Sequence, residues 1–192
     1  MKTDAVALKY NTNSLEAILE QAEKVAEYYK LPARKALQLR LLCEEVSNMI
    51  PELLYFSEGS FYIDGENKNV EIHVNLKAVK RMDMDKDRIL SVSADKKNSA
   101  KGIINGILNA VSSFLEGQEA AEQSPAFLDM MSLDTYPGAY WSLDNYMETE
   151  EYTNSEEPWD ELEKSIILGV ADDVKVGIVD KKVDIVIKKD FN

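Results

Sequence analysis

Two polar side chains, Glu44 and Asn48, lie four residues apart in an otherwise apolar stretch of the chain. This spacing places both on the same side of a helix. A carboxylate can orient a water or another attacking group at a phosphate, and an amide oxygen can help to hold a hard cation such as Mg²⁺. The pair therefore offers two groups that Mg²⁺-assisted phosphate chemistry can use. The alternative interpretation is a polar helix edge, because Glu-x-x-x-Asn arises often by chance.

The composition limits what other residues can contribute. The chain has 192 residues, which suits a single domain, residues 1–192, with one core. His73 is the single histidine and Cys43 the single cysteine, which excludes a multi-histidine metal centre and an internal disulfide. No apolar stretch approaches about 18 residues, and the first residues lack a signal-peptide pattern. We therefore expect a cytoplasmic protein with no membrane partner.

Charge is distributed unevenly along the chain. The net charge of −13 argues against a nucleic-acid partner. Residues 102–163 hold 14 acidic residues and no lysine or arginine, whereas residues 77–101 are rich in lysine and arginine. Within the acidic part, residues 118–157 form an aromatic-rich insertion. This insertion is interpreted either as a solvated loop anchored by its aromatic side chains or as a docking segment for a protein partner. A homo-oligomer also stays open.

Apolar periodicity predicts the helices that must position the pair. Helical spacing covers residues 14–30, with Asn13 or Ser14 as N-cap, and Pro32 separates this helix from a second one over residues 33–54. Pro51 should kink or end the last turn of the second helix. Further helices are predicted over residues 98–115 and 158–172. The second helix should bury a wide apolar stripe made of Leu37, Leu41, Leu42, Val46, Met49, Ile50 and Leu53.

Strict alternation predicts the strands. Residues 5–10 read as a short strand, residues 61–64 and 70–79 as a hairpin, and residues 174–179 and 183–187 as a second hairpin. His73 falls on the polar side of its strand, so we interpret it as an exposed strand histidine. Helices and hairpins in this order indicate an α+β fold arranged as a two-layer sandwich.

This arrangement, with a Leu-Pro break before a long helix that carries Glu44 and Asn48, resembles the anti-sigma-factor serine kinases. They belong to the GHKL (histidine-kinase-like) ATP-binding fold. The resemblance covers residues 6–79 and 162–187, and it implies a mixed β-sheet covered by helices on one face, with ATP and Mg²⁺ as cofactors. It also implies that Asn48 coordinates Mg²⁺ and that Glu44 acts as the base or positions the attacking group. We expect both side chains to look into a cavity that faces the sheet.

The chain departs from that family at its glycine motifs. The family reads adenine with Asp-x-Gly-x-Gly and cradles phosphate with Gly-x-Gly, and neither pattern occurs here. A substitute is the start of the helix predicted at residue 98, where a helix N-terminus and basic residues would attract an anion. The cofactor-binding residues expected there are Lys97, Asn98, Lys101 and Gly102, in addition to Asn48.

Two functions follow from these features. The first is a diverged GHKL-type ATP-binding regulatory protein, either a weak protein serine kinase or an inactive pseudo-enzyme. The second is a non-catalytic protein-binding module that kept the fold and lost the nucleotide, in which case it has no cofactor. A third arrangement has the acidic residues lying over residues 77–101 and filling the nucleotide cleft.

Overall fold

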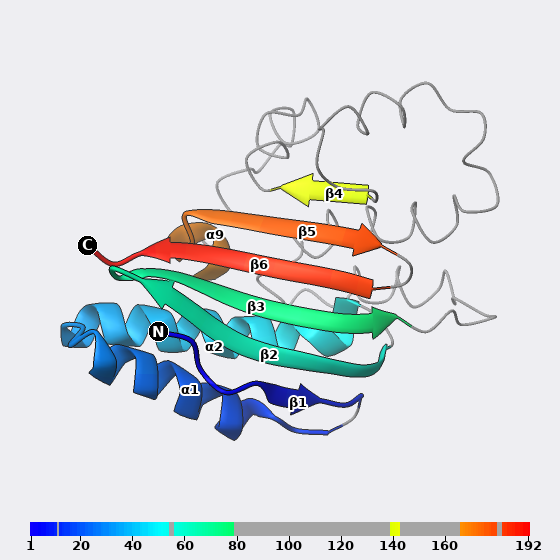
Figure 1. Cartoon of the computed structure of the whole chain (residues 1–192), viewed down its shortest axis with the longest axis horizontal. Helices are drawn as coiled ribbons and strands as arrows, with labels where there is room; N and C mark the ends of the chain where they lie inside the picture. Colours follow the sequence, from blue (N-terminus) through cyan, green and yellow to red (C-terminus); the bar gives the residue numbers. More distant parts are fainter. Residues whose placement is uncertain (11, 54–55, 79–138, 143–165, 180–181) are drawn as a thin grey trace.

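The computed structural model describes residues 1–10, 12–53, 56–78, 139–142, 166–179 and 182–192 (Figure 1). The helices predicted over residues 98–115 and the first part of the one over 158–172 lie outside these residues. The described elements are β1 (Val6–Leu8), α1 (Leu15–Tyr28), α2 (Ala33–Leu53), β2 (Phe56–Glu66), β3 (Asn69–Ala78), β4 (Ala139–Ser142), α9 (Ile166–Val170), β5 (Asp173–Val179) and β6 (Lys182–Asp190).

The six described strands form one sheet in the order β1-β2-β3-β6-β5-β4. Both predicted hairpins are confirmed, since β2 pairs with β3 and β5 pairs with β6, and β3 joins the two hairpins by pairing with β6. All five pairings are antiparallel. The mixed sheet that we expected is therefore wrong for the strands that the structure describes. The predicted α+β sandwich itself is confirmed.

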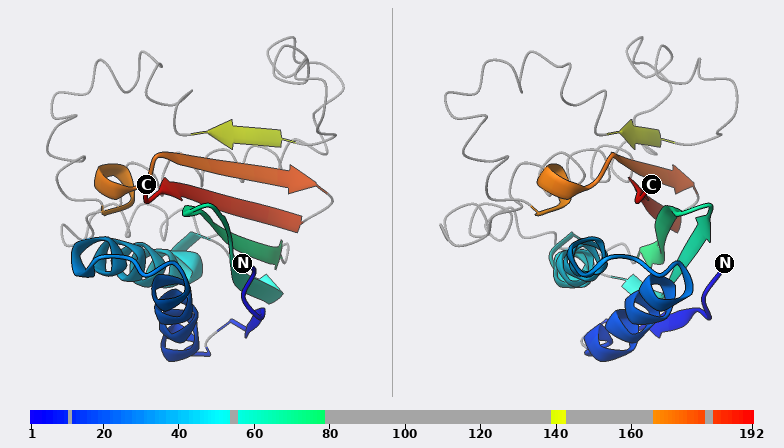
Figure 2. Two further views of the ribbon diagram at one scale, coloured as in Figure 1. Left: turned by 60° about the vertical axis from the view of Figure 1, so that its left-hand side comes forward. Right: turned by 90° about the vertical axis from the view of Figure 1, so that its left-hand side faces the viewer.

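One face of the sheet is apolar and buried, and the other is polar. Along β3, alternate residues from Val70 to Leu76 are buried, whereas the residues between them are half-buried. The same alternation in β2, β5 and β6 puts Phe61, Val176 and Ile185 on the buried face. The helices α1, α2 and α9 cover this face (Figure 2). Apolar area removed from water is thus concentrated between the two layers, where it stabilises the fold.

Local sequence explains how the two long helices begin. The side chain of Asn13 accepts a hydrogen bond of 3.0 Å from the backbone N–H of Leu15, so Asn13 satisfies one free amide at the start of α1. Lys30 follows α1 with a left-handed φ of 50°, and Pro32 precedes the first residue of α2. The two helices are therefore separated where the Leu-Pro pair predicts a break. Pro51 stands inside the last turn of α2, which continues to Leu53.

The turn between β2 and β3 uses two residues with positive φ. Asn67 has φ of 51° and Lys68 of 65°, as a two-residue turn of type I′ requires. On the same strand pair, a Cβ on Gly59 would lie 2.6 Å from the carbonyl oxygen of Asn75, so the two backbones approach too closely for a side chain there. β2 and β3 keep one register from Gly59 to the turn, and the register shifts between Phe56 and Gly59.

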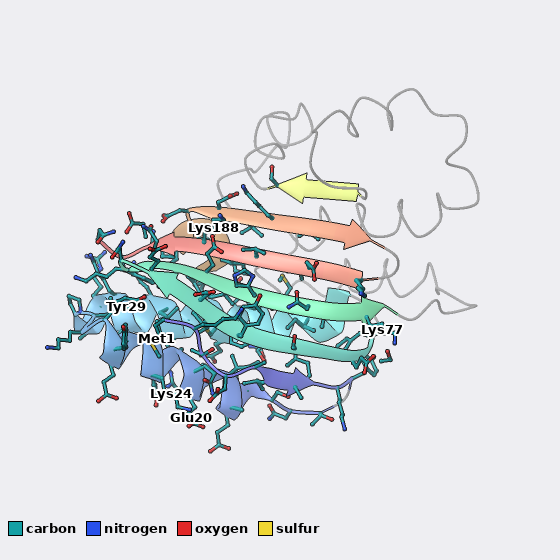
Figure 3. All side chains as sticks on the ribbon, viewed as in Figure 1. Met1, Glu20, Lys24, Tyr29, Lys77 and Lys188 are labelled. Carbon is teal, nitrogen blue, oxygen red and sulfur yellow. The ribbon has the colours of Figure 1, made fainter. Side chains whose placement is uncertain are left out.

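The end of α1 is tied to this hairpin. The hydroxyl of Tyr29 donates a hydrogen bond to the carbonyl oxygen of Gly65, and the N–H of Gly65 donates to the carbonyl oxygen of Met1 at 2.7 Å. Tyr29 and Met1 lie next to each other in Figure 3. Burial, with the neighbouring Tyr28 and acidic groups adding to it, raises the pKa of Tyr29. The hydroxyl therefore stays protonated and able to donate.

A buried amide on α1 offers a test of this packing. Gln21 is 6% exposed, and its Oε1 accepts no hydrogen bond from the described part of the chain. Replacing Gln21 with methionine removes an unsatisfied polar atom and keeps a flexible side chain of similar length. We expect Gln21→Met to raise the free energy of unfolding by about 1 kcal/mol, measured by urea denaturation. Gln38→Met, at a half-buried position of α2, is the control and should change little. A loss of stability in Gln21→Met would contradict the conclusion that the Gln21 side-chain oxygen is buried without a hydrogen bond.

Candidate functional site

The pair Glu44 and Asn48 lies on the side of α2 that points away from the sheet. The residues of α2 that are fully or almost fully buried are Leu39, Leu42, Cys43, Val46, Met49 and Ile50. With 3.6 residues per turn, Glu44 and Asn48 fall on the opposite side of the helix. Glu44 is half-buried and Asn48 is exposed. The expectation of a cavity facing the sheet is therefore wrong, because the pair faces outward from the sandwich.

Two consecutive carboxylates on α2 have different surroundings. Glu45 accepts a hydrogen bond of 2.7 Å through its Oε2 from the backbone N–H of Ile167 in α9. Glu44 and Asn48 form no hydrogen bond or ion pair with the described residues. Glu45 is therefore bonded within the fold, whereas Glu44 and Asn48 are not hydrogen-bonded to the described residues.

The donor set of the pair suits a hard cation, although it is incomplete. A carboxylate and an amide oxygen are ligands that Mg²⁺ accepts, and Mg²⁺ commonly fills its remaining positions with water and phosphate oxygens. Within the described ranges, no three His, Cys, Asp or Glu side chains group closely enough to hold a metal ion by themselves. The residues present therefore fit Mg²⁺ only when it arrives with a phosphate ligand.

The other predicted binding residues cannot be placed beside the pair. Lys97, Asn98, Lys101 and Gly102 lie outside the described residues, as do residues 118–157 apart from β4. β4 pairs with β5, with Tyr140 opposite Gly177 and Trp141 opposite Val176. The sequence interpretation left these aromatic residues inside a long insertion. Their high β-propensity was the available signal for a strand.

A second cluster of polar groups lies on the open face of the sheet, opposite the helices. The Tyr62 and His73 rings stack with centroids 4.6 Å apart and planes 7° from parallel. The ammonium group of Lys2 lies 4.2 Å from the centre of the Tyr62 ring. Glu71 contacts His73 at 3.2 Å and the β6 residue Lys188 at 2.7 Å. We call these five residues the open-face network. Sequence alone could not show that these residues are neighbours, because this depends on how β2, β3 and β6 are paired.

The surroundings of the open-face network lower the pKa values of two of its members, His73 and Glu71. Burial lowers the pKa of His73, and the attraction of the neighbouring Glu71 and Asp64 carboxylates offsets this only in part, while Lys2 adds to it. The hydrogen bond from Lys188 lowers the pKa of Glu71 despite partial burial. At neutral pH the network therefore contains a neutral imidazole between charged neighbours.

The single histidine gives a direct pH prediction. We expect the NMR titration of the His73 ring to have its midpoint below the value of about 6.5 of an unfolded chain. The unfolded chain then binds more protons than the folded one, so stability present above about pH 6.5 is lost as the pH falls through the folded-state pKa. In urea denaturation, His73→Gln should flatten this pH dependence. A midpoint equal to or above that of the urea-unfolded protein would contradict the prediction.

Cys43 is not a candidate nucleophile. It is fully buried in α2, and burial raises the pKa of its thiol. A reactive cysteine needs an accessible thiolate. Cys43 therefore belongs to the apolar core.

Comparison with known proteins leaves the chain unassigned to a family. No family model matches the chain, and no curated protein matches it significantly. Among the described residues, no helix is both long enough and apolar enough to cross a membrane.

Proposed function

We propose that the protein is a diverged GHKL-type ATP-binding regulatory protein, similar to the anti-sigma-factor serine kinases. The observation that carries this proposal is the pair Glu44 and Asn48. Both are polar, lie one turn apart, and form no hydrogen bond or ion pair with the residues that the structure describes. The long helix that bears them packs on an antiparallel sheet with its apolar side.

The proposal gives each residue of the pair one role. Asn48 would hold Mg²⁺ through its amide oxygen, and Mg²⁺ would supply charge to the phosphates of ATP. Glu44 would orient the attacking group and accept its proton. Lys97, Asn98, Lys101 and Gly102 are proposed to meet the phosphates from the start of the helix predicted at residue 98. Phosphotransfer is proposed to be weak or absent, because the glycine motifs that position the nucleotide in that family are missing.

Isothermal titration calorimetry tests the binding. We expect titration of the full chain with millimolar ATP and Mg²⁺ to give heat of binding, and the same titration with EDTA in place of Mg²⁺ to give much less. Glu44→Gln should keep most of the affinity, because the glutamine keeps an oxygen acceptor, and should remove any residual phosphotransfer to a serine peptide. Absence of heat at millimolar MgATP would end the proposal.

A second candidate function is a non-catalytic protein-binding module that binds no cofactor. The observation that favours it is apolar exposure on both sides of the connection between α1 and α2, where Tyr28 is 62% and Leu37 is 54% exposed. Leu37 lies on the outward side of α2, as Asn48 does. Large apolar and aromatic side chains are enriched at protein contacts. In this case the partner would bind equally well with and without MgATP, and residues 118–157 would add a second contact, which their deletion would remove.

A further inference from the structure

The outward side of α2 carries one continuous row of side chains. Its members follow one another at alternating separations of three and four residues, which keep them on one side of a helix: Arg34, Leu37, Leu41, Glu44 and Asn48. Arg34 and Leu37 are exposed, and Leu41 is half-buried. We call these five residues the outward stripe. It combines two leucines at its centre with polar and charged groups at its ends.

The neighbouring elements contact α2 on its two flanks. On one flank Arg40 donates a hydrogen bond to Glu23 of α1 at 2.6 Å, and on the other Glu45 accepts the bond from Ile167. With 3.6 residues per turn, Arg40 and Glu45 fall on opposite sides of the outward stripe. α1 and α9 accordingly lie on either side of α2 in Figure 2. Burial of Leu37 therefore requires a partner from outside the described fold.

The outward stripe has the same spacing from either end, with the sign of the charge reversed. Arg34 lies three residues before Leu37, and Glu44 lies three residues after Leu41. When two copies of α2 pack antiparallel with Leu37 of each against Leu41 of the other, Arg34 of each faces Glu44 of the other. Neither charged group forms a hydrogen bond or an ion pair with the described residues. The stripe is thus complementary to a second copy of itself.

We infer that the protein forms a symmetric homodimer through antiparallel packing of the outward stripe. A two-fold axis uses the same patch on both copies, so each contact occurs twice and the association closes at two chains. The leucine contacts remove apolar area from water at the centre, and the two Arg34–Glu44 pairs lie at the rim. A parallel arrangement would instead set Arg34 against Arg34 and Glu44 against Glu44, which like-charge repulsion disfavours.

The dimer covers Glu44 and so excludes nucleotide from the Glu44–Asn48 site, a consequence that rests on the proposed function. Glu44 cannot pair with Arg34 of the partner subunit and orient an attacking group at MgATP at the same time. MgATP therefore binds the monomer, and by mass action it draws the dimer apart. Self-association and nucleotide binding thus compete for one surface.

Charge reversal tests the dimer on the full chain, by sedimentation equilibrium without nucleotide. Arg34→Glu sets acidic groups against each other, and Glu44→Arg sets basic groups against each other. Because each substitution enters a two-fold dimer twice, we expect either one to raise the dimer Kd at least about tenfold. Lys9→Glu makes the same charge change as Arg34→Glu at an exposed position outside α2. It is the control and should dimerise as the wild type does.

Two combinations should restore the dimer. A one-to-one mixture of Arg34→Glu with Glu44→Arg pairs an acidic stripe with a basic one and should form a mixed dimer. The chain that carries both substitutions exchanges the two charges and should keep the dimer Kd within about threefold of the wild type. Circular dichroism checks that each variant is folded, and an unfolded variant would not regain dimerisation on mixing.

Each part of the inference has its own contrary result. A wild type that stays monomeric at every accessible concentration, or that assembles beyond two chains, would overturn the homodimer. Single variants that dimerise like the wild type, or a mixture that stays monomeric, would overturn the antiparallel packing. Saturating MgATP should raise the wild-type dimer Kd at least about tenfold, and an unchanged value would overturn the competition. If the wild type binds no MgATP, the proposed function fails together with the competition, while the nucleotide-free measurements still decide the dimer.

Discussion

Asn48→Ala is expected to weaken Mg²⁺-dependent ATP binding at least tenfold and to leave the stability of the fold unchanged. The amide oxygen of Asn48 is the proposed protein ligand of Mg²⁺, and altering even the residues that support a metal ligand typically costs about 10- to 100-fold in affinity or activity. Asn48 is exposed and forms no hydrogen bond with the described residues, so its truncation should cost less than about 0.5 kcal/mol of stability. Calorimetry and thermal unfolding measure the two effects separately.

Matched variants make this result specific. Gln38→Ala removes an amide from the same helix and should bind MgATP as the wild type does. Asn48→Asp keeps an oxygen ligand and should retain binding better than Asn48→Ala. Equal affinity in Asn48→Ala and the wild type would contradict the assignment of Asn48. If Asn48→Ala lost as much free energy of unfolding as free energy of MgATP binding, Asn48 would instead be a structural residue.

Phe61→Ala is expected to produce the largest loss of stability among single substitutions considered for this protein. Phe61 is fully buried in β2, and its strand neighbours are Val6 in β1 and Val74 in β3. Truncating a buried phenylalanine removes its transfer free energy and leaves a cavity, at a cost of about 3–5 kcal/mol. A domain of ordinary stability has only about 5–15 kcal/mol in total. Urea denaturation followed by circular dichroism should show a lower midpoint of unfolding, or a chain that is already largely unfolded without urea.

Two neighbouring variants calibrate this loss. Phe61→Leu keeps an apolar side chain at the site and should cost much less than the alanine variant. Ser60→Ala lies next in sequence, on the opposite face of the sheet, and should change the free energy of unfolding by less than about 0.5 kcal/mol. Equal losses at Ser60 and Phe61 would contradict the assignment of one buried face and one open face.

The strands were predictable because successive side chains of a strand point to opposite faces, so a strand with one buried face alternates apolar and polar residues. The run from Val70 to Lys77 separates apolar from polar side chains without exception, and the structure buries only the apolar ones. The turn was placed in the right region, residues 65–69, and its two left-handed residues are Asn67 and Lys68. β4 was missed because four residues between aromatic and acidic neighbours show no alternation. Its place at the sheet edge depends on β5, which lies far along the chain.

That Glu44 and Asn48 lie on the same side of α2 was predictable. Whether that side faces the sheet or faces outward was not. Helical spacing alone puts them on one side of α2. Which side faces the sheet depends on the rotation of the helix, and the predicted apolar stripe included Leu37, which is 54% exposed, and omitted Leu39, which is fully buried. A helix with leucines on more than one side has several rotations that bury similar apolar area. Contacts with α1, the sheet and α9 select one of them, and these contacts are not local in sequence.

Amide chemical shifts of α2 test the central claim most directly. In a heteronuclear NMR titration of the full chain with ATP and Mg²⁺, we predict progressive shifts at Glu44 and Asn48, with the open-face residues Tyr62 and His73 unaffected. Replacing Mg²⁺ with EDTA should abolish the shifts on α2. Unchanged α2 amides at millimolar MgATP, or shifts confined to the open face of the sheet, would contradict a nucleotide site at Glu44 and Asn48.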